Sequence, residues 1–129
     1  MIVGSGIDLV EIGRIQHSLD RYGSRFLGRV YTAGEQAYCL RKRNAAESLA
    51  ARFAAKEAVI KAFAEPDVPF PLREIEVTRE GPVPLLRLSG AVAERAQHQG
   101  WLSSSLSLSH ADCHAMAVVL VVCGPAESE

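Results

Sequence analysis

Residues 44–64, NAAESLAARFAAKEAVIKAFA, form the longest helical pattern in the chain. Asn44 followed three residues later by Glu47 is typical of a helix N-terminus, and Pro66 marks its end. At about 100° per residue, one face of this helix collects large apolar side chains, namely Leu49, Phe53, Ile60 and Phe63. We therefore expect a helix from residue 44 to about residue 64, with this face in the core.

A second face of the same helix carries small residues and two charges. Glu57 and Lys61 lie four residues apart on it. The residues that flank them on this face are all alanines: Ala46, Ala50 and Ala54. Because alanine side chains are short, another element or a ligand could approach the helix backbone closely here. Lys56 instead falls inside the apolar face, where its ammonium must reach solvent or a carboxylate.

The first residues of the chain predict a strand that carries a carboxylate. Ile2 to Val10 alternates in the manner of a half-buried strand. Because successive side chains of a strand point to opposite faces, Asp8 shares its face with Gly4 and Gly6. Asp8 therefore lies on a face where the two preceding residues, both glycines, have no side chain.

Two helices are expected between this strand and the central helix. The first runs from about Glu11 to Tyr22 and stops at Gly23. Its apolar side chains recur at helical spacing: Ile15, Leu19, Tyr22 and Phe26. Thr32 and Glu35 match a capping box, so the second helix is expected to begin there and to end near Lys42.

The second half of the chain predicts two hairpins with a short helix between them. Alternating apolar residues over 75–88 predict a hairpin that turns at Gly81-Pro82. A helix follows from Ala91 to about Gln99 and ends at a glycine. Strands over 105–109 and 115–122 are expected to form the second hairpin, with its turn at residues 110–112.

These elements predict one α+β domain over residues 1–129, with an N-terminal strand, a long central helix and an antiparallel sheet. Residues from about 125 to 129 are expected to form a loose tail. With 14 lysines and arginines against 15 acidic residues, no global field favours nucleic acid. The apolar run 115–123 is too short to span a membrane, and three cysteines without CxxC spacing predict a reducing, cytoplasmic location.

Asp8, Glu57 and Lys61 are the residues that could carry chemistry together. Taken singly, Glu57–Lys61 could be a solvated helix pair, Asp8 a helix cap and His110 a turn residue. Taken together, two carboxylates and a lysine suit Mg²⁺ with a diphosphate, because Mg²⁺ prefers a few carboxylate oxygens, waters and phosphate oxygens. The lysine could neutralise charge that develops on a leaving phosphate.

Three motifs occur in order along the chain: Gly4-x-Gly6-Ile7-Asp8, Arg52-Phe53-Ala54-Ala55-Lys56-Glu57-Ala58-x-x-Lys61, and Ser107-Leu108-Ser109-His110. In their residues, their separation and the chain length, they resemble the signatures of bacterial holo-acyl-carrier-protein synthases, and the resemblance covers nearly the whole chain. The resemblance implies the 4′-phosphopantetheinyl transferase fold. It also implies a reaction, in which phosphopantetheine moves from coenzyme A to a serine of apo-acyl carrier protein and adenosine 3′,5′-bisphosphate leaves.

The resemblance further implies a role for individual residues. Asp8 and Glu57 would bind Mg²⁺ together with the coenzyme A diphosphate, and the general base would be Glu57 or a metal-bound water. Lys61 would stabilise or protonate the leaving phosphate. The implied contacts to coenzyme A are Arg52, Lys61, Pro84 and His110. Family members of this length usually form homotrimers with active sites at subunit interfaces, so Asp8 and Glu57 are expected to face a neighbouring chain.

Arginines recur on the polar side of the first predicted helix and just beyond it: Arg14, Arg21 and Arg25. By composition alone this is a solvated basic face. Carrier proteins present an acidic helix beside their serine, so a basic stripe also suits them by charge complementarity. The resemblance places the carrier-binding helix here, with Arg14 and Arg21 as anchors.

Two other functions fit the same residues. A Mg²⁺-dependent hydrolase of small diphosphates would use both carboxylates with water as the nucleophile, and would need no basic docking face. A trimeric binding module without activity would use Asp8 and Glu57 only as ion-pair partners. Dependence of turnover on a carrier protein separates the first from a transferase. Metal-dependent stabilisation by coenzyme A, absent in Asp8→Ala, would argue against the second.

Overall fold

The computed structural model describes residues 2–125, so residues 126–129 of the expected tail lie outside it. The α+β class predicted from the sequence is confirmed. The elements, in chain order, are β1 (Ile2–Glu11), α1 (Ile12–Tyr22), α2 (Ser24–Val30), α3 (Ala33–Leu40), α4 (Ala45–Phe63), the 3₁₀ helix η1 (Leu72–Glu74), β2 (Ile75–Glu80), β3 (Val83–Leu88), α5 (Gly90–His98), β4 (Trp101–His110) and β5 (His114–Cys123).

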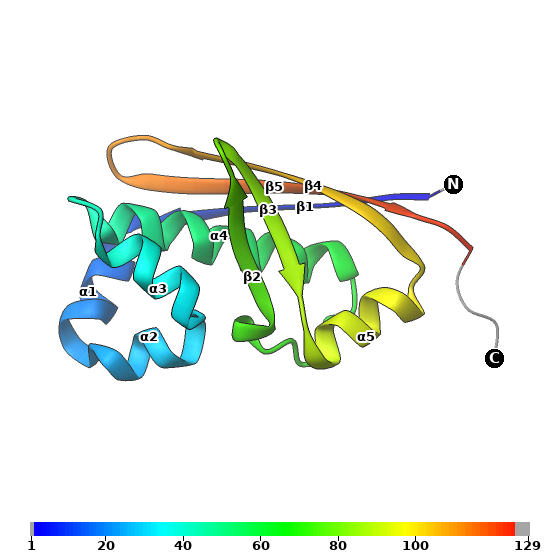
Figure 1. Ribbon diagram of the computed structural model, residues 1–129, viewed down its shortest axis with the longest axis horizontal. Helices are drawn as coiled ribbons and strands as arrows, with labels where there is room; N and C mark the ends of the chain where they lie inside the picture. The colour runs from blue at the N-terminus through cyan, green and yellow to red at the C-terminus, as the bar shows by residue number, and fades with distance from the viewer. Residues whose placement is uncertain (1, 126–129) are drawn as a thin grey trace.

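The strands form two antiparallel sheets. β5 lies in the middle of the larger sheet, between β1 and β4, and β2 pairs with β3 in a separate hairpin. Figure 1 shows the larger sheet along one side of the molecule, with α4 running beneath it and the other helices farther from the sheet. The two predicted hairpins are confirmed, and β4 begins earlier than expected, at Trp101.

Helix α4 packs on the sheet through its alanines. Ala50, Ala54 and Ala58 have no exposed surface. A Cβ placed on Gly6 of β1 would lie 2.8 Å from the carbonyl carbon of Ala58, closer than real contacts allow. The small-residue face therefore receives the backbone of β1. On the expected core face, Leu49 and Phe63 are buried, whereas Phe53 and Ile60 are only partly buried.

The buried Lys56 of α4 forms an ion pair with a carboxylate, as expected from its position in the apolar face. Lys56 is fully buried, and its Nζ lies 2.7 Å from Oε1 of Glu35 in α3. The same ammonium donates to the carbonyl oxygens of Leu72 at 3.0 Å and Ile75 at 2.5 Å. Glu35 also accepts from the backbone N–H of Val77 at 2.9 Å. One buried ion pair thus joins α3, α4 and the start of β2, with its polar atoms satisfied.

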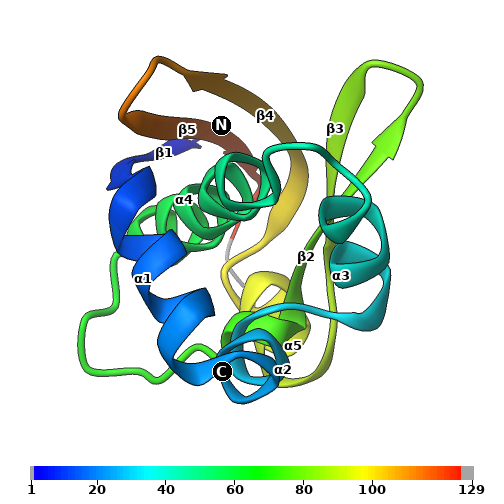
Figure 2. The ribbon, with the colours of Figure 1, turned by 90° about the vertical axis from the view of Figure 1, so that its left-hand side faces the viewer.

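The region between α1 and α3 differs from the prediction. The capping box of Thr32 and Glu35 is present, but a further helix, α2, follows Gly23 directly. Sequence reasoning missed it because seven residues give too short an apolar pattern. Tyr22 is 50% exposed and does not belong to the buried stripe of α1. Figures 1 and 2 show α1, α2 and α3 gathered around the N-terminal end of α4.

Candidate active site

Two elements bring the predicted catalytic residues together. Asp8 projects from β1 toward α4, and Nζ of Lys61 lies 2.9 Å from its Oδ1 and 3.0 Å from the carbonyl oxygen of Ile7. Asp8 and Glu57 line one surface cleft of about 310 Å³. The absence of side chains at Gly4 and Gly6 lets β1 lie close enough to α4 for this. Lys61 pairs with Asp8 across the two elements, so the predicted alternative of a Glu57–Lys61 pair on one helix is not what forms.

Glu57 is tuned by its surroundings. Partial burial raises the pKa of its carboxyl group above the usual value, and the nearby charge of Asp8 raises the pKa further, while Lys61 lowers it. Two carboxylates in one cleft repel each other, and a cation bound between them would offset this repulsion. This favours a positively charged ligand at the cleft.

The donor set fits Mg²⁺ with a substrate better than it fits a protein-built metal cage. Within residues 2–125, no three His, Cys, Asp or Glu side chains lie close enough together to hold an ion. Asp8 and Glu57 offer carboxylate oxygens, and a hard divalent cation readily takes its other ligands from water and phosphate. The residues present therefore fit the expected metal.

Two of the three predicted docking arginines, Arg14 and Arg25, lie at or beside this cleft, whereas Arg21 lines neither the cleft nor the groove next to it. Arg14 of α1 lines the cleft itself, together with Ser18 and Phe26. Ser18 and Phe26 also line an adjoining groove with Arg25 of α2. Two further residues complete that groove: Tyr22 and Arg29. Gly23 ends α1 as expected, yet α2 carries the basic surface onward, so Arg25 remains part of it.

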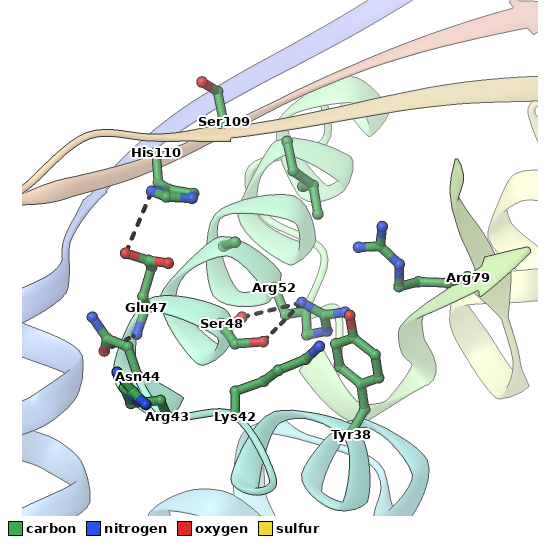
Figure 3. Close-up of a pocket in the computed structure, with 12 residues that line it drawn as sticks. Tyr38, Lys42, Arg43, Asn44, Glu47, Ser48, Arg52, Arg79, Ser109 and His110 are labelled. Carbon is green, nitrogen blue, oxygen red and sulfur yellow. Dashed lines mark hydrogen bonds and ion pairs between the residues drawn. The ribbon is translucent and has the colours of Figure 1, made fainter. Parts of the chain in front are cut away.

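A second pocket contains two of the predicted coenzyme A contacts. Arg52 and His110 both line it, and its volume is about 520 Å³. Arg52 is only 4% exposed, and its Nη1 donates to the carbonyl oxygen of Ser48 at 3.3 Å and to Oγ of Ser48 at 3.2 Å. Nδ1 of His110 lies 3.4 Å from Oε2 of Glu47 (Figure 3). The β4–β5 turn is thereby tied to the first turn of α4.

The two pockets lie on different sides of α4. Arg52 and Glu57 are five residues apart, which places them about 140° apart around the helix axis. No residue lines both pockets. Pro84, the fourth expected coenzyme A contact, lies opposite Arg79 in the β2–β3 hairpin and does not line either pocket. Within one chain, Arg52 and His110 are therefore not brought next to Asp8 and Glu57.

Several residues of the second pocket were missed by sequence reasoning. They are mainly basic or aromatic: Tyr38, Lys42, Arg43 and Arg79. The basic run 41–43 directly before the Asn44 cap is a signal that could have been used, because a cap places such residues at the N-terminal end of α4. Arg79 had no such signal, since only the packing of the hairpin brings it to the pocket.

Comparison with known proteins places this arrangement among the 4′-phosphopantetheinyl transferases. The model of the 4′-phosphopantetheinyl transferase superfamily matches residues 4–119. A holo-[acyl-carrier-protein] synthase of Koribacter versatilis is 46% identical over 125 residues, covering 94% of this chain and 98% of the relative. The synthase of Thermus thermophilus is 44% identical over 121 residues, covering 94% of each chain.

Solved structures agree with this comparison. A Chronobacterium ammoniagenes ACPS–CoA complex superposes with a TM-score of 0.87 at 32% identity, covering 97% of this chain and all of that one. A Helicobacter pylori holo-[acyl-carrier-protein] synthase in complex with coenzyme A gives a TM-score of 0.79 at 32% identity, covering 92% and 99% of the two chains. The resemblance drawn from the three sequence motifs is confirmed.

Proposed function

This chain belongs to the holo-[acyl-carrier-protein] synthase family of the 4′-phosphopantetheinyl transferase superfamily, and we propose that it transfers phosphopantetheine from coenzyme A to a serine of apo-acyl carrier protein. The observation that carries the proposal is the cleft in which Asp8 and Glu57 meet beside Arg14. A phosphate-handling site and a basic docking surface adjoin there, as a transfer between a nucleotide and an acidic protein requires.

The reaction exchanges one phosphorus–oxygen bond for another. The carrier serine oxygen attacks the β-phosphorus of coenzyme A, and the bond to adenosine 3′,5′-bisphosphate breaks. The serine proton passes to a base, for which Glu57 is suited because burial and Asp8 raise the pKa of its carboxyl group above the usual value. Lys61, which is half-exposed at the cleft, can neutralise the charge left on the departing phosphate.

Mg²⁺ belongs to this proposal as the ion that Asp8 and Glu57 would hold. When bound, it would supply positive charge to the phosphate oxygens. The two carboxylates position that charge, and their mutual repulsion favours cation binding. Lys61 already engages Asp8 at 2.9 Å, which leaves Glu57 without a bonded cation among the described residues.

The pocket of Arg52 and His110 would hold the remaining phosphate of coenzyme A. Once the diphosphate lies at Asp8 and Glu57, the 3′-phosphate is the anionic group left to bind. Among the residues lining the pocket, four carry permanent positive charges: Lys42, Arg43, Arg52 and Arg79. Because this pocket lies on another side of α4 from Glu57, a second chain would have to supply it. This supports an active site shared between subunits.

The outer face of the β1–β5–β4 sheet supports a homotrimer. Its apolar side chains are between 37% and 62% exposed: Val3, Ile7, Leu9, Met116 and Leu120. In Figure 1 the helices lie on the opposite side of this sheet. A contiguous apolar face of this kind is typical of an interface between subunits.

We place the reaction in the cytoplasm. All three cysteines, Cys39, Cys113 and Cys123, are free thiols in the structure, which suits a reducing compartment. Within residues 2–125, no helix combines the length and apolar character needed to cross a membrane.

Release of adenosine 3′,5′-bisphosphate tests the proposal against a diphosphate hydrolase. A transferase releases it from coenzyme A only when an apo carrier protein is present, and a carrier whose acceptor serine is replaced by alanine will not support release. Release at the same rate without a carrier would favour a hydrolase instead. Arg14→Glu should slow carrier-dependent release more strongly than any release without a carrier, because Arg14 lies where the cleft meets the proposed docking surface.

A further inference from the structure

Tyr38 of α3 stands at the centre of three positive charges. The Cζ atom of Arg52 lies 4.5 Å from the centroid of the Tyr38 ring, Nζ of Lys42 lies 4.6 Å from it, and Cζ of Arg79 lies 5.9 Å from it. The three cations come from α4, from the loop after α3 and from β2 (Figure 3). No other aromatic ring among residues 2–125 is approached by as many cations.

Within the described part of the chain, no carboxylate forms an ion pair with Lys42, Arg52 or Arg79. Glu47, which lines the same pocket, faces His110 at 3.4 Å. Glu76, in the groove on the other side of Tyr38, accepts from Oγ1 of Thr32 at 2.6 Å. Like charges repel, so the face of the tyrosine ring is the attractive partner that Arg52, Lys42 and Arg79 share.

Arg52 is held in a way that leaves bonding capacity unused. Its recorded hydrogen bonds, to the backbone and hydroxyl oxygens of Ser48, both come from Nη1. Its Nε is buried and has no hydrogen-bond partner among the described residues. A buried guanidinium with an unpartnered N–H, lining a cationic pocket, is typical of a site that awaits an anion.

The ionisation of Tyr38 reflects the same surroundings. Partial burial raises the pKa of its phenol, but a polar contact from Lys42 and the charges of Arg79, Lys42 and Arg52 outweigh this and lower the pKa below its usual value. The positive charges around the ring therefore stabilise the ionised form of the phenol, and they would stabilise the negative charge of a bound phosphate in the same way.

We propose that Tyr38 is a positioning residue for phosphate recognition, which holds Arg52 and Arg79 side by side against their repulsion so that they grip the 3′-phosphate of coenzyme A. This inference rests on the proposed function. It adds that the preference for coenzyme A over 3′-dephospho-coenzyme A depends on a ring that does not itself have to touch the substrate. Both of the pockets that Tyr38 lines also contain Arg52 and Arg79.

The test compares two donors in two variants. Tyr38→Leu removes the ring, whereas Tyr38→Phe keeps it and serves as the matched control. Tyr38→Leu should lower kcat/KM for coenzyme A by about tenfold, mainly through KM, because each lost cation–π contact corresponds to about a two- to fivefold change in affinity and more than one is lost. The same variant should change kcat/KM for 3′-dephospho-coenzyme A by less than about twofold, and Tyr38→Phe should stay within about threefold of the wild type for both donors.

The two donors separate a positioning role from a merely structural one. Equal losses for both donors, or an unchanged ratio between them, would overturn the proposal, and thermal melting of each variant shows whether the fold is intact. Calorimetric binding of adenosine 3′,5′-bisphosphate and of adenosine 5′-monophosphate gives the same ratio without turnover. Absence of transfer in the wild type would refute the proposed function, while the binding ratio would still decide the role of Tyr38.

Discussion

At the scale of single residues, Glu57 is the group whose ionisation should govern activity. Burial and the charge of Asp8 raise the pKa of Glu57, and a metal-binding carboxylate has to be deprotonated. The protonated fraction therefore grows as pH falls through the raised pKa, and metal affinity falls with it. Because its pKa is raised, Glu57 becomes protonated at a higher pH than a free glutamate does.

We predict that the Mg²⁺ concentration needed for half-maximal activity rises as pH falls, by up to about tenfold per pH unit once Glu57 is mostly protonated. Saturating Mg²⁺ should restore much of the lost rate, because the metal competes with the proton for the same carboxylate. Initial rates over a grid of pH and Mg²⁺ concentration measure this. A half-saturating concentration that does not change from about pH 8 down to about pH 5, close to the ordinary range of a glutamate carboxyl, would contradict the assignment of Glu57.

The chemistry of these residues could be read from the sequence, but their partners could not. Asp8, Glu57 and Lys61 stood out by type and spacing, and the structure places Asp8 and Glu57 in one cleft with Lys61 paired to Asp8. The sequence offered Glu57 as the partner of Lys61, four residues away on one helix, whereas Asp8 is its partner across 53 residues. Tyr38 went unnoticed for the same reason, since three separate segments supply its cations.

At the scale of elements, the close approach of β1 to α4 is what builds the cleft. A Cβ at Gly6 would also lie 3.0 Å from the backbone nitrogen of Ala62, so neither backbone could stay in place. Gly13 of α1 provides a matched control, because a Cβ there meets nothing within 4 Å.

Gly6→Ala should destabilise the protein by about 2–3 kcal/mol, because the added methyl group overpacks the contact between strand and helix. Gly13→Ala should be neutral or stabilise it by up to about 1 kcal/mol, since alanine is the better helix former. Urea unfolding of both variants measures the difference. Equal stabilities would mean that β1 does not lie against α4 as closely as described.

The helices α1 and α2 form the other element-level feature, a basic surface that leads to the cleft. Arg14 lines the cleft, and the guanidinium of Arg21 lies 5.6 Å from the centre of the Tyr22 ring on the same helix. The order of strands and helices along the chain, including the long helix, could be predicted from periodicity. The helix α2 and the exposure of Tyr22 could not. Tertiary packing decided which apolar side chains of α1 became buried.

Reversing Arg14 and Arg21 to glutamate should raise KM for the carrier protein by at least about tenfold, because each reversal turns an attraction into a repulsion. The affinity for coenzyme A should fall less than the affinity for the carrier, because neither arginine lines the pocket of Arg52 and only Arg14 lines the cleft of Asp8 and Glu57. Steady-state kinetics with the carrier varied, together with calorimetry for coenzyme A, separate the two effects. Unchanged carrier kinetics would remove this surface from the account.

At the scale of the whole molecule, the proposed function predicts that a second chain completes the site, because the two pockets lie on different sides of α4. Glu57→Ala would remove a proposed metal ligand from one half of the site, and Arg52→Ala would remove a proposed phosphate contact from the other half. If neighbouring subunits supply the two halves, a trimer that contains both variants has some sites in which both halves are intact.

Mixed assembly should therefore restore activity to two impaired proteins. After unfolding and refolding an equal mixture, about one quarter of the sites should be intact in a randomly assembled trimer. Each variant refolded alone should remain impaired, and thermal melting confirms that each folds. No recovery in a mixture shown by mass spectrometry to contain mixed trimers would mean that each chain holds a complete site.

The most direct measurement is the intact mass of an apo-acyl carrier protein after incubation with this protein, coenzyme A and Mg²⁺. We predict that the carrier gains one phosphopantetheine group, and that EDTA or Glu57→Ala abolishes the gain. A carrier of unchanged mass, with the protein folded and coenzyme A bound, would contradict the account and leave binding without transfer as the function of the site.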